Sequence, residues 1–338
     1  MELLRSYIKG VGAYLPERIV TNDDLAKIME TSHDWIVQRT GIHRRRWVTS
    51  ETCSDLALRA CQNALVAAEL DKSQIDLIIF ATLSPDHDFP GTGCYLQAKL
   101  GLSGVPALDI RQQCTGFLYG LSIADQFIRS GKYQNILLVG SEVHSRGLDK
   151  SNRGRDVTVL FGDGAGAVVV SATKVQSSDK DSYLYSTHLH ADGNFADELS
   201  LPAPGCANGG DERIDLAMLE AGLHYPKMNG KKVFMNAVRR MSEVLVECLE
   251  ANRTNISEVD LFLFHQANLR INEAVAHELS IPWEKVFNTI ENYGNTTAAT
   301  LPIGMHDAIV QGKLKKGMKV AMAAFGSGFT WASALMRY

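Results

Sequence analysis

The chain has 338 residues, of which 45% are hydrophobic and 21% charged, a composition typical of a globular protein with one or two packed domains. Its formal net charge of -4 offers no excess of positive charge for a nucleic-acid backbone or an anionic membrane surface. No apolar run approaches the roughly 20 residues that a membrane helix needs. We therefore expect neither nucleic acid nor a membrane among the partners.

Cysteine usage indicates the compartment. The six cysteines form neither a C-x-x-C pair nor a zinc-type pattern with histidine. This predicts free thiols in a reducing cytoplasm and no metal site. Residues 1–6 run directly into a strand-like segment rather than a secretory signal, so we expect cytoplasmic localisation.

Apolar, β-rich segments recur at residues 76–82, 105–110, 135–141 and 260–265, with helix-period segments between them. Strands that alternate with helices predict an α/β fold with a buried, mainly parallel sheet. The clearest helix covers residues 231–251, where apolar side chains recur at steps of three and four.

Two glycine-rich segments echo each other and suggest an internal duplication. Residues 161–166 lead into an apolar run at 167–171, and residues 325–328 lead into another at 329–336. We interpret each as a strand, a glycine turn and a second strand. The region 177–229 is rich in Gly, Pro, Asp and Asn, which predicts loops between the two halves.

Cys114 lies between an apolar strand and an amphipathic helix, in the sequence Gln-Gln-Cys-Thr-Gly-Phe. A thiol at a helix start faces the positive end of the helix dipole and unpaired backbone N–H groups, and both favour the thiolate. A buried structural cysteine is the alternative. The strand-to-helix position and the small residues Thr115 and Gly116 favour a nucleophile.

His265 and Asn295 are the other candidates for chemistry. His265 follows an apolar strand and precedes a helix, a position where α/β proteins bind ligands, although it could be a satisfied core histidine. Asn295 lies in a glycine turn that opens a helix, where it could serve only as a cap. A cap alone would not require the small residues Ala298 and Ala299, which suggest that something approaches the helix start closely.

Two patterns could indicate other ligands. Three arginines at positions 44–46 precede Trp47, a pattern compatible with nucleic acid, but in an acidic chain we interpret it as a solvated face. Residues 10–16 show part of a dinucleotide-binding fingerprint, but the third glycine is missing and Pro16 follows. We expect no nicotinamide cofactor.

The segments around Cys114, His265 and Asn295 closely resemble the β-ketoacyl-acyl-carrier-protein synthase III family, and the resemblance extends in the same order over nearly the whole chain. It implies an α/β, thiolase-like fold, duplicated in five αβαβα layers, and a homodimer. The implied halves are residues 1–175, which carry the nucleophilic cysteine, and residues 176–338, which carry the histidine and the asparagine.

The resemblance also implies a two-step condensation. An acyl group moves from a coenzyme A thioester to Cys114, after which a malonyl-acyl-carrier protein loses CO2 and its carbanion attacks the acyl-enzyme. The backbone N–H groups of Cys114 and Ser327 would form the oxyanion hole. A neutral His265 and Asn295 would both donate hydrogen bonds to the malonyl thioester oxygen. The product would be 3-oxoacyl-acyl-carrier protein in fatty-acid initiation, with acyl-coenzyme A as a substrate and no cofactor.

The resemblance also implies binding roles for residues at positions that match the family. Trp35 and Arg155 would sandwich the adenine of coenzyme A, and Arg39 would help to hold that end. Arg153, two residues before Arg155, is an alternative for the same role. Phe89 would close the acyl pocket of the partner subunit.

Arg270 would contact the acidic carrier protein. The chain departs from the commonest family pattern in the Gln-Gln pair at 112–113 and in Met235, where a carrier-contacting lysine is often found. These departures leave open a secondary-metabolite condensing or acyl-transfer enzyme with a longer or unusual primer. A cysteine thioesterase is an alternative of another class, which has no need of Asn295. The complete set of three residues argues against a catalytically silent carrier-binding protein.

Overall fold

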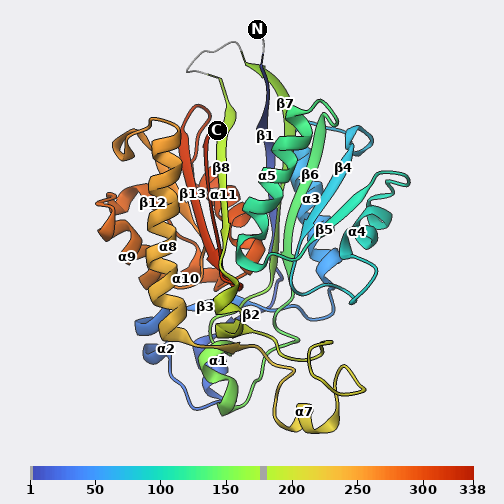
Figure 1. Ribbon diagram of the computed structural model, residues 1–338, viewed down its shortest axis with the longest axis vertical. Coiled ribbons are helices and arrows are strands. Elements are labelled where there is room, and N and C mark those ends of the chain that lie inside the picture. The colour runs from blue at the N-terminus through green and yellow to red at the C-terminus, as the bar shows by residue number, and fades with distance from the viewer. Residues whose placement is uncertain (1–2, 176–180) are drawn as a thin grey trace.

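Two five-stranded sheets lie side by side and carry the fold (Figure 1). The computed structural model describes residues 3–175 and 181–338. The strand order is β1-β7-β6-β4-β5 in the first sheet and β8-β14-β13-β11-β12 in the second, so the two orders correspond strand for strand. The bounds in the first sheet are β1 (Leu3–Tyr14), β4 (Leu77–Ala81), β5 (Ala107–Ile110), β6 (Asn135–Glu142) and β7 (Gly164–Val175). Those in the second are β8 (Tyr183–Ala191), β11 (Leu261–Phe264), β12 (Val286–Phe287), β13 (Lys319–Gly326) and β14 (Thr330–Arg337).

Six longer helices complete five layers. Helices α3 and α4 cover the outer face of the first sheet, α5 and α11 lie between the sheets, and α8 with α9 covers the outer face of the second (Figure 1). Their bounds are α3 (Cys53–Ala67), α4 (Thr92–Leu100), α5 (Gly116–Arg129), α8 (Gly230–Ala251), α9 (Leu269–Glu278) and α11 (Thr300–Val310). This arrangement confirms the predicted thiolase-like αβαβα fold. Residue 176, where the second half was predicted to begin, lies outside the described residues.

Short elements frame the lower part of the molecule in Figure 1. The strands are β2 (Ile19–Thr21), β3 (Arg44–Arg46), β9 (Leu199–Ser200) and β10 (Lys227–Met228). The helices are α1 (Asn22–Ala26), α2 (His33–Thr40), α6 (Arg155–Thr158), α7 (Leu216–Glu220) and α10 (Ile290–Tyr293). No helix among the described residues is both long and apolar enough to cross a membrane.

The prediction of mainly parallel sheets is wrong, because both sheets are mixed. Strand β4 pairs in parallel with β5 and β6, and β11 pairs in parallel with β12 and β13. The other pairings within each sheet are antiparallel. The glycine turn after Phe325 joins β13 to β14 as a hairpin, and so short a connection permits only antiparallel pairing. The glycine turn after Phe161 instead follows helix α6, so the strand predicted before it is absent from this described segment.

Helix α8 confirms the predicted long helix, with its start one residue earlier at Gly230. Asn229 caps it by accepting a hydrogen bond from the backbone N–H of Lys232. Met241, Leu245 and other apolar side chains of its inner stripe are buried against the second sheet. Each such side chain contributes about 1.5–3 kcal/mol by leaving water.

Contrary to our expectation, the three arginines at 44–46 do not form a solvated face. Strand β3 alternates its side chains, which places Arg44 outside and buries Arg45 completely. Arg45 donates hydrogen bonds to Asn22 Oδ1 at 2.8 Å and to the carbonyl oxygen of Val159 at 3.0 Å. These bonds offset part of the cost of burying the charge, although the Nε of Arg45 has no hydrogen-bond partner among the described residues.

Candidate active site

Cys114 lies in a sharp turn between the end of β5 and the start of α5. The preceding residue, Gln113, has a left-handed φ of 45°, which is uncommon for a residue with a side chain. Gly326, at the end of β13, packs directly against Cys114, because a Cβ built there would lie 2.8 Å from the cysteine Cβ. The hairpin of the second sheet therefore supports the thiol of the first.

His265 follows β11 directly and is buried. Its Nδ1 lies 2.8 Å from Thr300 Oγ1, at the start of α11. Its Nε2 is also buried, yet has no hydrogen-bond partner within the described residues. Burial lowers the pKa of His265 to about 3, so the imidazole is neutral at physiological pH. An unpartnered buried nitrogen is rare in folded proteins and suits a ligand-binding role.

Two backbone hydrogen bonds tie Asn295 to residues 160–162. Its backbone N–H donates to the carbonyl oxygen of Leu160 at 2.8 Å, and its own carbonyl accepts from Gly162 N–H at 3.1 Å. Its side-chain Oδ1 accepts from Thr297 N–H at 2.8 Å. Asn295 is not the cap of α11, whose N-cap position is Ala299 and has no side-chain bond; its own bond closes a turn to Thr297 that fixes the amide and leaves its nitrogen for another partner. Gly140 of β6 packs against the carbonyl group of Ala298, and Gly116 lies beside its side chain, because a Cβ built on Gly116 would lie 3.5 Å from the Ala298 Cβ.

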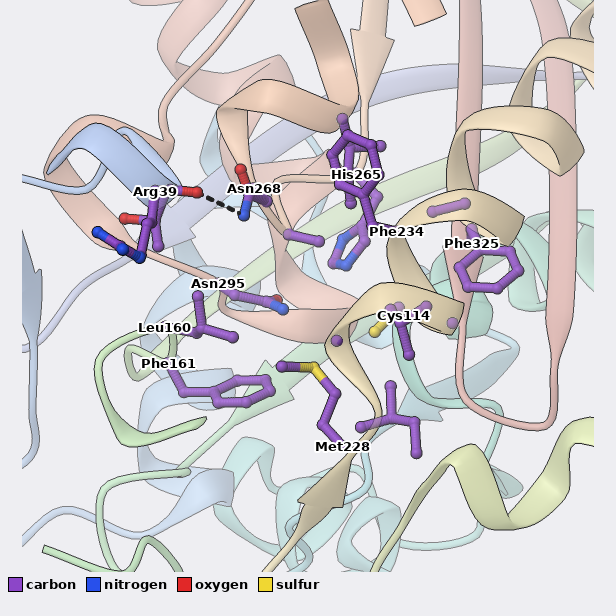
Figure 2. Close-up of a pocket in the computed structure, with 18 of the residues that line it drawn as sticks. Arg39, Cys114, Leu160, Phe161, Met228, Phe234, His265, Asn268, Asn295 and Phe325 are labelled. Carbon is purple, nitrogen blue, oxygen red and sulfur yellow. Dashed lines mark hydrogen bonds between the residues drawn. The ribbon is translucent and has the colours of Figure 1, made fainter. Parts of the chain in front are cut away.

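The three side chains gather around one cavity of about 290 Å³. Figure 2 shows the sulfur of Cys114, the imidazole of His265 and the amide of Asn295 directed toward its interior. Cys114 comes from the first sheet's side of the molecule and the other two from the second. The other lining residues include Trp35, Arg39, Leu160, Phe161, Met228 and Phe234.

A second cavity of about 500 Å³ also reaches Cys114. Ser327 lines it, and the backbone N–H groups of Ser327 and Cys114 both donate toward the sulfur. Half of its other lining residues are apolar, among them Leu83, Val143, Leu148, Phe161, Leu199 and Leu201, and the rest include Arg111, Gln113, His144 and His224. Cys114 thus lies where two cavities meet. His265 and Asn295 line the first cavity but not the second.

The thiol of Cys114 is neutral in the resting protein, contrary to the expectation of a thiolate. Burial, reinforced by the nearby Glu142 carboxylate, raises the pKa of Cys114 to about 12. The hydrogen bonds from the N–H groups of Cys114 and Ser327 lower it, but by less. The positive end of the α5 dipole favours the thiolate. The removal of the thiol from water favours the neutral form by more.

Glu142 ends β6 and is completely buried. Its carboxylate accepts hydrogen bonds from the hydroxyls of Thr82 and Ser84, at 3.1 and 2.5 Å, and from the backbone N–H of Leu83. Burial raises the pKa of Glu142 to about 7 despite these donors. The carboxylate anchors the loop after β4, whose residues Leu83 and Ser84 line the second cavity.

Trp35 lies at the outer end of the first cavity, with two guanidinium groups over its ring. The central carbon of Arg39 is 4.5 Å from the ring centroid, and that of Arg155 is 4.6 Å from it. Arg153 instead binds Asp149 at 2.6 Å, so the structure places Arg155 rather than Arg153 beside the tryptophan. Because Arg155 contacts the Trp35 ring directly, its guanidinium must move away before another planar group can enter between them.

The remaining predicted residues lie outside the two cavities. Phe89 is 82% exposed and lines neither of the two cavities. Arg270 is exposed at the start of α9, 5.7 Å from the Phe234 ring. Asn268 caps α9 and also donates to the carbonyl oxygen of Arg39 at 2.9 Å, which ties α9 to α2 (Figure 2). Met235 is exposed on α8.

Several residues that shape the site carry no strong sequence signal. Met228 and Phe234 belong to segments that we interpreted as a loop and as helix core, yet both line the first cavity. Thr300 belongs to the asparagine segment, but only its contact with His265 shows its role. His144 lines the second cavity and was not a candidate. Its Gly-Ser-Glu-Val-His segment, at the end of a buried strand, was the available signal.

Fold and site define a thiolase-like α/β protein with a cysteine, a histidine and an asparagine at the junction of its halves. The family described as 3-oxoacyl-[acyl-carrier-protein (ACP)] synthase III matches residues 108–193, and the C-terminal part of that family matches residues 249–338. A β-ketoacyl-[acyl-carrier-protein] synthase III 1 from Vibrio parahaemolyticus is 43% identical over 334 residues, which cover 98% of this chain and 99% of that protein. The chain belongs to the β-ketoacyl-acyl-carrier-protein synthase III family of acyltransferases.

Solved structures agree with this assignment. The crystal structure of 3-oxoacyl-[acyl-carrier-protein] synthase III from Aquifex aeolicus matches with a TM-score of 0.88 at 44% identity, covering 98% of this chain and all of that one. A priming β-ketosynthase from a polyketide biosynthetic pathway matches with a TM-score of 0.88 at 28% identity, covering 100% of this chain and 98% of that one.

Proposed function

We propose that this protein condenses an acyl-coenzyme A primer with malonyl-acyl-carrier protein, with loss of CO2, and so starts fatty-acid synthesis. The observation that carries the proposal is the meeting of Cys114, His265 and Asn295 at one cavity, together with two backbone N–H groups at the sulfur. The family assignment supports the reaction class. Trp35, Arg39 and Arg155 at the outer end of the cavity suit the adenine and phosphates of coenzyme A.

In the first step the sulfur of Cys114 attacks the thioester carbonyl of acyl-coenzyme A. The N–H groups of Cys114 and Ser327 stabilise the oxyanion, a contribution that typically amounts to about 10²- to 10³-fold in rate for each donor. Because the thiol is neutral at rest, its proton must leave as the bond forms, and coenzyme A departs as the free thiol. The acyl group stays on Cys114 as a thioester.

In the second step the malonyl thioester loses CO2, and its electrons pass into an enolate. Asn295 donates from its amide nitrogen and His265 from Nε2, where the neutral ring carries its proton when Thr300 donates to Nδ1. The Thr300 hydroxyl lies 2.8 Å from Nδ1 and 3.1 Å from the Thr297 carbonyl oxygen, and the proposed step requires that its one proton points to Nδ1. The enolate carbon then attacks the acyl-enzyme, releases the Cys114 sulfur and yields 3-oxoacyl-acyl-carrier protein.

The size of the second cavity favours a primer larger than acetyl. A volume of about 500 Å³ falls in the range of pockets that hold ligands of many atoms, whereas an acetyl group has two carbons. The apolar half of its lining, which includes Leu83, Val143 and Leu148, suits a hydrocarbon chain. This observation keeps a secondary-metabolite condensing enzyme as the second candidate, and a priming polyketide β-ketosynthase is among the structural relatives.

We further propose that the protein is a cytoplasmic homodimer, and that it uses acyl-coenzyme A as a substrate and needs no cofactor. All six cysteines are free, which suits a reducing compartment. The exposed Phe89 supports a dimer in which each subunit completes the acyl cavity of the other. Arg270 would contact the acidic carrier protein from the exposed side of α9. The two halves, 1–175 and 176–338, are proposed as the units of the duplication.

The test is intact-protein mass spectrometry after exposure to acyl-coenzyme A thioesters of two to twelve carbons, followed by malonyl-acyl-carrier protein. We expect one acyl adduct per chain, fastest for primers longer than acetyl, and release of 3-oxoacyl-carrier only when malonyl-carrier is present. Cys114→Ala should abolish the adduct, whereas His265→Ala should retain acylation and lose condensation. Release of free acid without malonyl-carrier would instead identify a thioesterase, and acylation of the Cys114→Ala protein would refute the assignment.

A further inference from the structure

His144 is a buried imidazole to which the proposed reaction assigns no chemical step. It lies two residues beyond β6 and lines the second cavity beside Cys114. Its ring packs against Phe161, with 4.7 Å between the centroids, and its Nε2 lies 2.6 Å from Thr297 Oγ1. Burial lowers its pKa to about 3, so the ring is neutral and makes an uncharged hydrogen bond to the threonine.

Thr297 holds an unfavourable backbone conformation. Its φ of 48° lies in the left-handed region, which is unusual for a β-branched residue and persists only when the surroundings hold it. Within the described residues, its hydroxyl has His144 as its one hydrogen-bond partner. The imidazole is therefore the side-chain contact that holds this turn.

The turn at Thr297 reaches both residues of the condensing pair. Its N–H donates to Asn295 Oδ1 at 2.8 Å, which fixes the orientation of the asparagine amide. Its carbonyl oxygen accepts from the backbone N–H of Thr300, whose hydroxyl lies 2.8 Å from His265 Nδ1. A shift of Thr297 would thus misalign both donors that the second step needs.

We propose that His144 is a positioning residue that holds Thr297 and thereby orients Asn295 and His265 for condensation. The inference rests on the proposed function. Acylation of Cys114 uses the N–H groups of Cys114 and Ser327, which lie outside this chain of hydrogen bonds, so the two steps should respond differently to its loss.

The test compares the two steps in His144→Leu, which keeps much of the side-chain volume and removes the hydrogen bond. We expect the condensation kcat to fall by on the order of 10- to 100-fold, and by clearly more than the rate of acylation, which a leucine in the lining of the second cavity also affects. The KM for malonyl-acyl-carrier protein should change little. His144→Gln, whose amide nitrogen can reach the same hydroxyl, should restore most of the rate.

Thr297→Val and Thr297→Ser form a matched pair from the other side of the bond. The valine variant should lose condensation as His144→Leu does, the serine variant should retain most of it, and the double variant should lose no more than either single one. Wild-type condensation in His144→Leu would overturn the proposal, as would an equal fall in both steps together with a lower Tm. If wild-type protein forms no acyl-enzyme, the proposed function fails first, which separates that outcome from these.

Discussion

At the scale of single residues, the chemistry depends on how little water reaches the reacting groups. Cys114 and His265 are both buried, and burial favours the neutral form of each. A neutral His265 suits a hydrogen-bond donor to an enolate, because an imidazolium would transfer a proton to it. Because Cys114 is neutral at rest, its thiol must lose its proton during the attack on a thioester. The two N–H donors stabilise the charge that forms in that attack.

The raised pKa of Cys114 predicts the pH dependence of its alkylation. The fraction present as thiolate should rise about tenfold per pH unit up to a pKa of about 12, so the rate with iodoacetamide should climb from pH 7 to pH 9 without levelling. Intact mass measured over time gives the rate. Cys114→Ala provides the background from Cys94 and Cys206, which are exposed. A plateau below pH 8 would contradict the assignment of a neutral thiol.

At the scale of elements, the β13–β14 hairpin supports the nucleophile across the junction of the two halves. Ser327 at its tip supplies one N–H donor, and Gly326 leaves no room for a side chain beside Cys114. The α11 start supplies the other support, through Thr297 and Thr300. The reacting groups therefore depend on contacts between segments that lie far apart in sequence, as Gly326 with Cys114 and His144 with Thr297 do.

Gly326→Ala tests the hairpin contact. The added methyl group would lie 2.8 Å from the Cβ of Cys114, so we expect a loss of about 1–3 kcal/mol in the free energy of unfolding and at least tenfold slower acylation. Chemical denaturation and the rate of mass gain measure the two effects. Gly193→Ala is the control, because a Cβ there meets nothing within 4 Å. Equal behaviour of the two variants would show that the contact is unimportant.

At the scale of the whole molecule, the first sheet ends in an edge strand that is open to pairing. Strand β5 has a sheet neighbour on one side only, and Leu108 on it is 39% exposed. Unpaired backbone groups on an edge strand readily pair with another chain. Phe89 projects from the loop after β4, the strand next to β5.

We therefore expect Leu108→Lys to turn a dimer into a monomer, because it places a charge on the edge that would pair. Sedimentation equilibrium gives the mass, and the same sample gives the condensation rate, which should fall if the partner's side chain completes the cavity. Val66→Lys is the control, since Val66 is 78% exposed on α3, on the outer face of the first sheet. A wild-type protein that sediments as a monomer would refute the proposed homodimer.

Local sequence patterns were sufficient to predict the main helices and strands and the candidate site residues. The apolar period of 231–251 predicted α8, and the repeated segments predicted a duplicated α/β fold, because periodicity reports which face of an element is buried. The ends of apolar strands singled out Cys114 and His265, since such ends lie at the edge of a sheet where ligands bind. The identity of those residues, with Asn295, sufficed to indicate the family.

The tertiary structure decided what depends on neighbours distant in sequence. Burial made Cys114 a neutral thiol and enclosed Arg45, and neither outcome follows from the residues beside them. The direction of half the strand pairings, the two cavities and the contact of His144 with Thr297 likewise arise where segments far apart in the chain meet. Desolvation and packing are properties of that enclosure, so a linear pattern of residue types cannot encode them.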